Sequence, residues 1–179
     1  ISRANGTLTF PANFMLIGAM NPCPCGYYGD TLKQCTCAPG AITTYQKRIS
    51  GPLLDRIDML IHVPRVDYQK LSSSRQGESS AVIRERVEHA HQRQSERFAG
   101  TALFSNADMS PAELRRFCVL DAASQALMQT AMRQLQLTAR GYHRVLKLAR
   151  TIADLADSAE ITQIHLAEAL QYRAKEFEF

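Results

Sequence analysis

Phe14-Met-Leu-Ile-Gly-Ala-Met20 is a continuous apolar run with the length of a β-strand. A run without polar alternation is typical of a strand that is buried on both faces, as in parallel sheets. Asp58-Met-Leu-Ile-His-Val63 has the same character and ends at Pro64. Short helical patterns over residues 41–49 and 52–56 lie between the two runs, so this region predicts an α/β fold containing part of a parallel sheet.

The residues before the first apolar run predict a β-hairpin. Ser2-Arg3 and Thr7-Leu-Thr-Phe10 flank Ala4-Asn5-Gly6, and Asn-Gly between extended segments is a strong hairpin signal. Pro11 then ends the second segment.

The second half of the chain predicts an all-α bundle. Residues 65–80 are polar and rich in serine, as linkers are, and divide the chain into predicted domains 1–70 and 71–179. Beyond the linker, apolar residues recur at helical spacing, and Ser110-Pro-Ala-Glu113 has the form of a capping box. Amphipathic helices joined by short loops form bundles. The predicted helices cover residues 78–98, 111–118, 121–136, 138–156 and 162–172. Their predicted inward positions are Ile83, Val87, Ala90, Leu127, Met128, Ala131, Met132, Leu135, Val145, Ala149, Ile152, Ala156, Ile164, Leu166 and Leu170.

Composition limits the classes of function open to the chain. Of its 179 residues, 45% are hydrophobic and 21% charged, which permits a buried core. No apolar run approaches the roughly 20 residues that span a bilayer, so no membrane partner is expected. The net charge of +4 permits a nucleic-acid partner without requiring one, and the absence of Trp argues against a stacking platform for single strands. Because the chain begins at Ile1 and has no secretion signal, we expect a piece of a longer, cytoplasmic protein.

Four of the five cysteines lie close together, as Cys23-Pro-Cys25 and Cys35-Thr-Cys37. Two thiolate pairs can complete a tetrahedral Zn²⁺ shell, and Gly26 and Gly29 let the loop turn around it. Four sulfur ligands leave no open position, so the predicted zinc is structural. The alternatives are free thiols or thiols oxidised after purification; thioredoxin-like chemistry is disfavoured because it uses C-x-x-C. Cys118 stands alone in a helical pattern and is predicted to be a small buried hydrophobe.

Three polar side chains are candidates for a phosphate or nucleotide site. Asn21 follows the first predicted strand at its carboxyl end, where ligands of open parallel sheets lie; a strand-ending Asn-Pro turn is the alternative. Arg56 lies between Asp55 and Asp58, and its planar fork matches phosphate, although an ion pair with either acid is the alternative. Arg140 lies in the first turn of a predicted helix, where a positive charge opposes the helix dipole unless an anion or an acid compensates.

The sequence contains no G-x-x-x-x-G-K-[ST] phosphate loop and no Asp-Glu pair that would hold Mg²⁺. No Ser-His-Asp or Cys-His arrangement has a supporting motif either. This chain alone is therefore not expected to bind and hydrolyse a nucleotide in the P-loop manner.

Several segments together resemble the magnesium-chelatase-like AAA+ ATPases of the competence protein ComM (YifB) type. They are Ile1-Ser-Arg-Ala4, Met20-Asn-Pro-Cys-Pro-Cys-Gly26, Gly51-Pro-Leu-Leu-Asp-Arg-Ile-Asp58, and Ala139-Arg-Gly-Tyr-His-Arg144 with Ala149-Arg-Thr-Ile-Ala-Asp-Leu155. The resemblance covers essentially the whole chain. It implies the C-terminal part of an AAA+ core, after the Walker A and Walker B motifs, followed by an α-helical lid.

The resemblance also implies a role for each candidate residue. Asn21 falls at sensor 1, where it would align the attacking water. Arg56 falls at the arginine finger, which reaches the nucleotide of a neighbouring subunit, and Arg140 at sensor 2, at the start of a lid helix. The hairpin over residues 1–10 matches the pre-sensor 1 hairpin that touches DNA in this clade, which makes Arg3 a predicted DNA contact.

The implied function is that of a hexameric ring that uses ATP and Mg²⁺ to translocate on DNA, as a helicase that promotes branch migration in natural transformation and recombination. Two other classes of function remain open. A magnesium- or cobalt-chelatase motor subunit would act on a protein partner and a porphyrin, but the four-cysteine loop is not expected there. A non-enzymatic, zinc-bearing DNA-binding module would need its basic residues in one patch.

Overall fold

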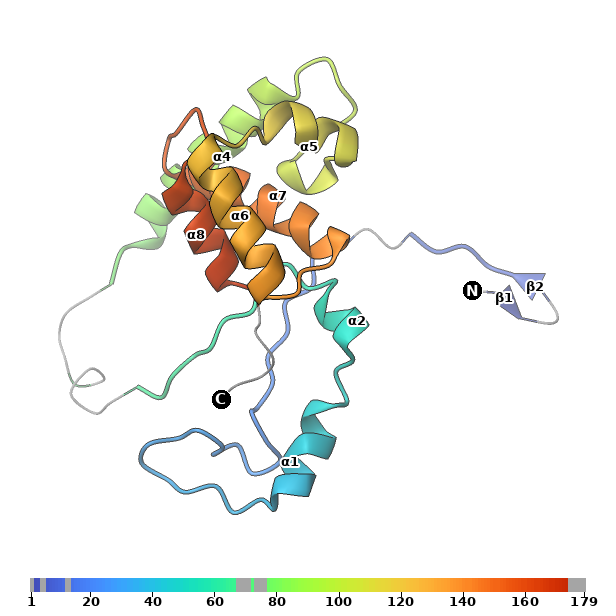
Figure 1. The fold of residues 1–179 in the computed structure, drawn as a ribbon, viewed down its shortest axis with the longest axis vertical. Helices are drawn as coiled ribbons and strands as arrows, with labels where there is room; N and C mark the ends of the chain where they lie inside the picture. Colours follow the sequence, from blue (N-terminus) through green and yellow to red (C-terminus); the bar gives the residue numbers. More distant parts are fainter. Residues whose placement is uncertain (1, 4–5, 12–13, 67–71, 73–76, 174–179) are drawn as a thin grey trace. The chain divides into compact units, whose positions relative to one another are not determined.

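Among the residues that the structure describes, the regular structure is mainly helical, with a small antiparallel sheet (Figure 1). The computed structural model describes residues 2–173 except 4–5, 12–13, 67–71 and 73–76. The chain divides into two compact units, one from the N-terminus to Gln46 and one from Lys47 onward. The domain boundary predicted after residue 70 lies outside the described residues.

The described residues of the first unit form the predicted hairpin and one helix. Strand β1 (Ser2–Arg3) pairs antiparallel with β2 (Gly6–Thr7), and Arg3 lies opposite Gly6. Helix α1 (Pro39–Gln46) follows the four-cysteine loop directly. The hairpin prediction is confirmed, and the helix predicted over residues 41–49 is present, beginning and ending a few residues earlier.

The two predicted parallel strands are not present. Residues 14–20 and 58–63 have no regular secondary structure, and their large apolar side chains are largely exposed, with Ile17 at 86% and Val63 at 81%. A strand is stable where a neighbouring strand takes its backbone hydrogen bonds. The only sheet among the described residues is β1–β2, so neither segment has such a neighbour. The prediction of parallel strands is therefore wrong for the described chain.

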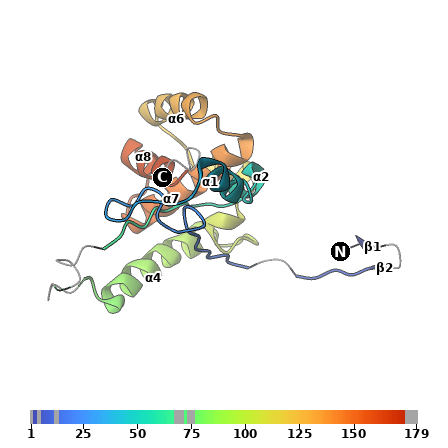
Figure 2. The ribbon, with the colours of Figure 1, turned by 90° about the horizontal axis from the view of Figure 1, so that it is seen from below.

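The second unit is a helical bundle, and its helices follow the predicted ones closely. Contacts join α7 to α4, α5 and α8, and join α6 to α8. Helices α7 and α8 lie between α4 on one side and α6 on the other (Figure 2). None of the described helices is both long and apolar enough to cross a bilayer. The elements are α2 (Gly51–Leu54), α4 (Ser80–Arg97), the 3-10 helix η1 (Asn106–Asp108), α5 (Pro111–Phe117), α6 (Ala122–Gln134), α7 (Ala139–Leu155) and α8 (Gln163–Gln171).

Side-chain caps explain where the helices of the bundle begin. The Ser110 hydroxyl accepts from the Ala112 N–H at 3.2 Å, and the Glu113 carboxylate accepts from the Ser110 N–H at 2.7 Å, as a capping box requires. Asp121 accepts from the Ser124 N–H at 2.7 Å at the start of α6. Each such cap satisfies a backbone donor that the helix itself leaves unpaired.

The core of the bundle surrounds α7. Val145 and Ala149 of this helix are fully buried, and Leu166 of α8 packs in the same cluster. Cys118 is 5% exposed in this core, which confirms it as a small buried hydrophobe. Four predicted inward positions are wrong: Ile83 and Val87 of α4 are 41% and 39% exposed, Ile164 of α8 is 76% exposed, and Ala156 is exposed at the C-cap of α7.

A buried polar network crosses this core. The Asp154 carboxylate of α7 is fully buried and accepts two hydrogen bonds from Arg97 at the end of α4. Arg150, one turn earlier on α7, lies 3.2 Å from the same carboxylate and also donates to the Ser158 carbonyl at 2.7 Å. The Asn106 amide of η1 completes the set, donating to Asp154 at 2.8 Å. One carboxylate therefore links α4, η1 and α7.

Candidate functional site

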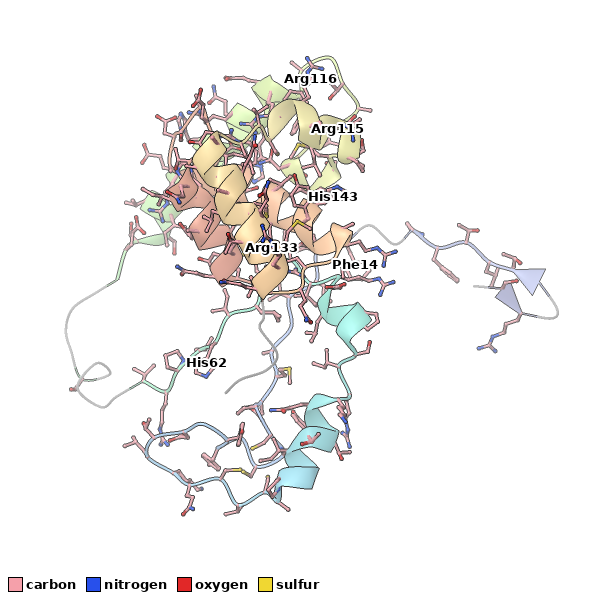
Figure 3. All side chains as sticks on the ribbon, in the orientation of Figure 1. Phe14, His62, Arg115, Arg116, Arg133 and His143 are labelled. Carbon is pink, nitrogen blue, oxygen red and sulfur yellow. The ribbon has the colours of Figure 1, made fainter. Side chains whose placement is uncertain are left out.

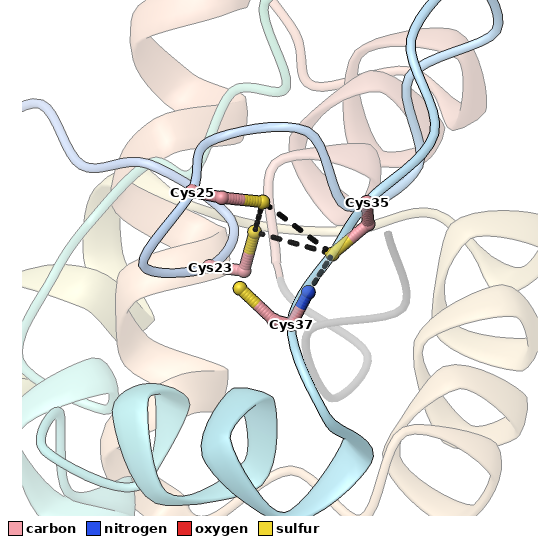
Figure 4. Close-up of side chains that lie close together, drawn as sticks. All are labelled: Cys23, Cys25, Cys35 and Cys37. Carbon is pink, nitrogen blue, oxygen red and sulfur yellow. Dashed lines mark hydrogen bonds between the residues drawn. The ribbon is translucent and has the colours of Figure 1, made fainter.

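The four cysteines of the N-terminal loop converge (Figure 4). The Cys23 Sγ lies 3.4 Å from that of Cys25 and 3.7 Å from that of Cys35, and the last two sulfurs are 3.6 Å apart. With Cys37 included, all four sulfurs lie within 4.8 Å of one another. Tetrahedral zinc with Zn–S bonds of about 2.3 Å places its sulfur ligands about 3.8 Å apart. The donor set and its spacing therefore fit a four-sulfur zinc shell.

The loop backbone is shaped to hold the sulfurs together. Gly26 and Gly29 have φ of 83° and 79°, a region that favours glycine. The Gly26 N–H donates to the Cys23 carbonyl at 3.0 Å, which closes the turn around the first cysteine pair. The Cys37 N–H points at the Cys35 sulfur at 3.4 Å, and a donor of this kind favours the thiolate, the form that binds metal.

The four sulfurs lie close enough that the charge on one thiolate changes the pKa of the others. Backbone N–H donors, those of Tyr27 and then Thr36, lower the pKa of Cys25 to about 5. At Cys35 the Cys37 N–H lowers the pKa, but burial and the neighbouring thiols outweigh it and raise the pKa to about 12. Sulfurs this close repel one another as thiolates, so one ionises readily and another resists. A bound dication removes that conflict, because its charge stabilises all the thiolates together.

We expect protein prepared without chelators to contain one equivalent of zinc. The Cys35→Ser variant should lose that zinc, because three sulfurs no longer close the shell. Cys118→Ala is the matched control, since this cysteine lies in the core of the helical unit and should leave the metal content unchanged. Elemental analysis with thiol titration measures both variants. Four titratable loop thiols in metal-free, fully folded wild-type protein would contradict the prediction.

Asn21 lies at the entrance to the four-cysteine loop. Its side chain is exposed, and its amide lies 3.8 Å from the point where a Cβ on Gly26 would stand. The order of the cysteine loop thus bears on where this amide points. Asn21 follows a segment without strand structure, so the carboxyl end of a parallel strand, where the sequence placed it, is not present in the described chain.

Arg56 is exposed, and neither neighbouring acid is its partner. Its guanidinium donates to the Pro52 carbonyl at 2.7 Å, which folds it over α2. Asp55 instead lies 3.5 Å from Arg173, and Asp58 forms an ion pair with Arg144. The alternative of a local ion pair with Asp55 or Asp58 is therefore wrong. Within the described part of the chain, Arg56 is an arginine without an acidic partner.

Arg140 is exposed in the first turn of α7, whose N-cap is Thr138. The Thr138 hydroxyl accepts from the Gly141 N–H at 3.1 Å and donates to the Asp55 carboxylate at 3.1 Å. An acid therefore stands at the N-terminus of α7 and compensates the helix dipole there. The bundle thus brings the segment of Arg56 and the helix of Arg140 together, a contact that sequence spacing did not predict.

Other basic side chains of the helical unit are spread over several helices. Arg115 and Arg116 lie on α5, and Arg133 lies on α6, away from them (Figure 3). His143 lies on α7 and lines a cavity of about 250 Å³ with Arg115. In the first unit, Arg3 is exposed on β1. The described helical unit thus does not gather these arginines into one patch.

Two family models match the chain. The C-terminal model of magnesium chelatase subunit ChlI matches residues 77–173, the helical bundle without α2. The model described as magnesium chelatase, subunit ChlI, matches residues 1–71.

Curated relatives are similar along nearly the whole chain. The sequence is 44% identical over 175 residues to the competence protein ComM of Haemophilus influenzae. It is 39% identical over 175 residues to the protein YifB of Escherichia coli and to that of Salmonella typhimurium. Each similarity covers 97% of this chain and 33% of the relative. The chain therefore spans about a third of the length of these relatives.

Proposed function

Because this chain belongs to the magnesium chelatase subunit ChlI family, we propose that it supplies Asn21, Arg56 and Arg140 to the nucleotide sites of an AAA+ ATPase ring that acts on DNA. In this proposal residues 1–70 complete an AAA+ core and residues 71–179 form its lid. The ring is a hexamer that uses ATP and Mg²⁺. Its P-loop belongs to a part of the full-length protein outside this sequence.

The state of Arg56 is the single observation that supports the proposal most. Arg56 stands between Asp55 and Asp58 in the sequence, but the two acids are engaged by Arg173 and Arg144. The guanidinium is left with a neutral carbonyl partner, Pro52 O. An anion such as a nucleotide phosphate replaces that bond with a stronger, charge-assisted one. Arg56 is therefore free to act as an arginine finger on a neighbouring subunit.

Arg140 and Asn21 have complementary roles in the proposal. Arg140 acts as sensor 2 on the nucleotide of its own subunit, from the start of the lid helix. Asn21 acts as sensor 1 and orients the attacking water through its amide. The zinc-bound cysteine loop keeps that amide in place, because ordering such a loop costs roughly 1–2 kcal/mol per residue and thiolate ligation supplies on the order of 10 kcal/mol.

ATP hydrolysis by two purified proteins tests the proposal. The full-length protein should hydrolyse ATP, and the 179-residue chain should not, since it has no P-loop. Phosphate release at saturating ATP measures both. Turnover by the highly purified 179-residue chain, or its absence in the assembled full-length protein with DNA, would contradict the proposal.

DNA binding by the hairpin has its own test. We expect Arg3→Ala in the assembled full-length protein to weaken DNA binding and to reduce the salt dependence of the affinity, because one phosphate contact per subunit is lost. Arg133→Ala, on α6, is the matched control. Fluorescence anisotropy at several salt concentrations gives both quantities. Unchanged affinity in Arg3→Ala would remove the hairpin from the DNA path.

A motor subunit that acts on a protein partner is the second candidate, because both matching family models are those of a magnesium chelatase subunit. The four-cysteine loop favours the DNA-acting branch. Stimulation of ATP hydrolysis by DNA separates the two candidates. A non-enzymatic DNA-binding module is disfavoured by the spread of Arg115, Arg116 and Arg133 over different helices (Figure 3).

A further inference from the structure

The segment that carries Arg56 is fastened to two helices of the bundle by polar contacts. Arg173, which follows α8, is 8% exposed and donates to the Ile57 carbonyl at 2.7 Å. The same guanidinium lies 3.5 Å from Asp55. Three residues after Ile57 a backbone hydrogen bond is added, in which the Leu60 N–H donates to the Tyr172 carbonyl at 3.0 Å.

The Asp55 carboxylate also contacts the N-terminus of α7. The Thr138 hydroxyl donates to Asp55 Oδ2 and at the same time caps α7 by accepting from the Gly141 N–H. Asp55 therefore touches both helices, α7 through Thr138 and the end of α8 through Arg173. Asp55 directly precedes Arg56, and Thr138 lies two residues before Arg140.

We propose that Asp55 and Arg173 are positioning residues that tie the Arg56 segment to the helix of Arg140, so that nucleotide binding at one arginine is transmitted to the other. This inference rests on the proposed function, in which Arg140 touches the nucleotide of its own subunit and Arg56 that of the neighbour. The tie would thus connect successive nucleotide sites around the ring.

The contacts of Arg173 and Thr138 are buried or shared, as a mechanical connection between the two segments requires. Arg173 is almost fully covered, so its bonds to Ile57 and Asp55 are little screened by solvent. The Thr138 hydroxyl makes its two bonds at once, so a movement of the α7 N-terminus changes the bond to Asp55 directly. By contrast, the pair between Arg144 and Asp58 is more exposed, with the Asp58 side chain 67% exposed, and contributes less.

Amide hydrogen exchange in the full-length protein tests the tie itself. In the wild type, exchange over residues 51–60 should slow when ATP analogue binds at the Arg140 site. In Asp55→Asn and in Arg173→Met, basal exchange over 51–60 should rise about tenfold, and the response to the analogue should disappear. Asp157→Asn is the matched control: it removes the exposed ion pair with Arg93, and asparagine tolerates the positive φ of that position.

Steady-state kinetics test whether these contacts affect ATP hydrolysis. We expect kcat of Asp55→Asn to fall about tenfold with KM within about threefold and with reduced cooperativity, because Arg56 is misplaced while the nucleotide's own site is intact. Unchanged exchange over 51–60 in both variants would overturn the tie. Altered exchange with wild-type kcat and cooperativity would overturn the coupling. Full activity in Arg56→Ala would instead overturn the proposed function, which distinguishes the two failures.

Discussion

Replacing Arg56 with alanine in the full-length protein is expected to lower the rate of ATP hydrolysis by a factor of about 10³–10⁵ and to leave nucleotide binding nearly unchanged. An arginine delivered across a subunit interface stabilises charge that develops only in the transition state. The side chain is exposed, and Asp55 and Asp58 are held by other arginines, so its removal should not disturb the fold. Phosphate release and fluorescent-nucleotide titration measure the two quantities.

Mixed rings test whether Arg56 acts across the interface. A second variant that lacks the P-loop lysine is inactive because its own nucleotide site fails, whereas Arg56→Ala damages its neighbour's site. Mixing the two should restore part of the turnover, since some interfaces then combine an intact P-loop with an intact Arg56. Arg133→Ala, an exposed arginine of α6, should keep wild-type activity. Absence of rescue at every mixing ratio would contradict action between subunits.

The helices could be predicted from sequence because the signals that start them are local. Ser110 and Glu113 form the predicted capping box, and Thr138 caps α7 as expected. The prediction that placed Ile164 inside failed although its helix is present. Ile164 and Leu166 are two residues apart, which on an α-helix separates their side chains by about 200°. Leu166 is buried and Ile164 therefore faces solvent.

The two parallel strands could not be predicted reliably, because such a strand depends on residues that pair with it from elsewhere in the sequence. The runs over 14–20 and 58–63 have strand-like composition, yet no described strand lies beside them. The same holds for the interactions of Arg56. Its nearest acids in sequence, Asp55 and Asp58, are paired with Arg173 and Arg144, which are distant in sequence. The cysteine cluster was predictable because its four members lie in one short loop.

The buried network of Asp154 was not predicted either, because charged residues in a sequence are normally expected at the surface. One signal was available: Arg150 and Asp154 follow Leu146 at intervals of four residues, so they share a face of α7 with a buried leucine. Charges on such a face are buried only with partners. The partner of Asp154, Arg97, is 57 residues away, which local patterning does not reveal.

We therefore expect Asp154→Ala to destabilise the helical unit by about 3–5 kcal/mol, the cost of leaving buried charges without their counterion. The substitution removes the carboxylate that neutralises Arg97 and Arg150, whose side chains are 14% and 4% exposed. It also removes the acceptor of the Asn106 amide. Urea unfolding of the 179-residue chain, monitored by circular dichroism, gives the free energy of unfolding.

Two further variants show whether burial of the charge is the cause. Asp157→Asn removes a carboxylate that lies three residues away but is 68% exposed in its pair with Arg93, and should change the free energy of unfolding by less than about 1 kcal/mol. The triple variant Arg97→Met, Arg150→Met, Asp154→Leu removes the charges together, and should recover much of the stability lost in Asp154→Ala because no unpaired charge is left. An Asp154→Ala protein as stable as Asp157→Asn would show that Asp154 does not hold α4 and α7 together. A triple variant less stable than Asp154→Ala would show that the stability is lost through packing and not through charge.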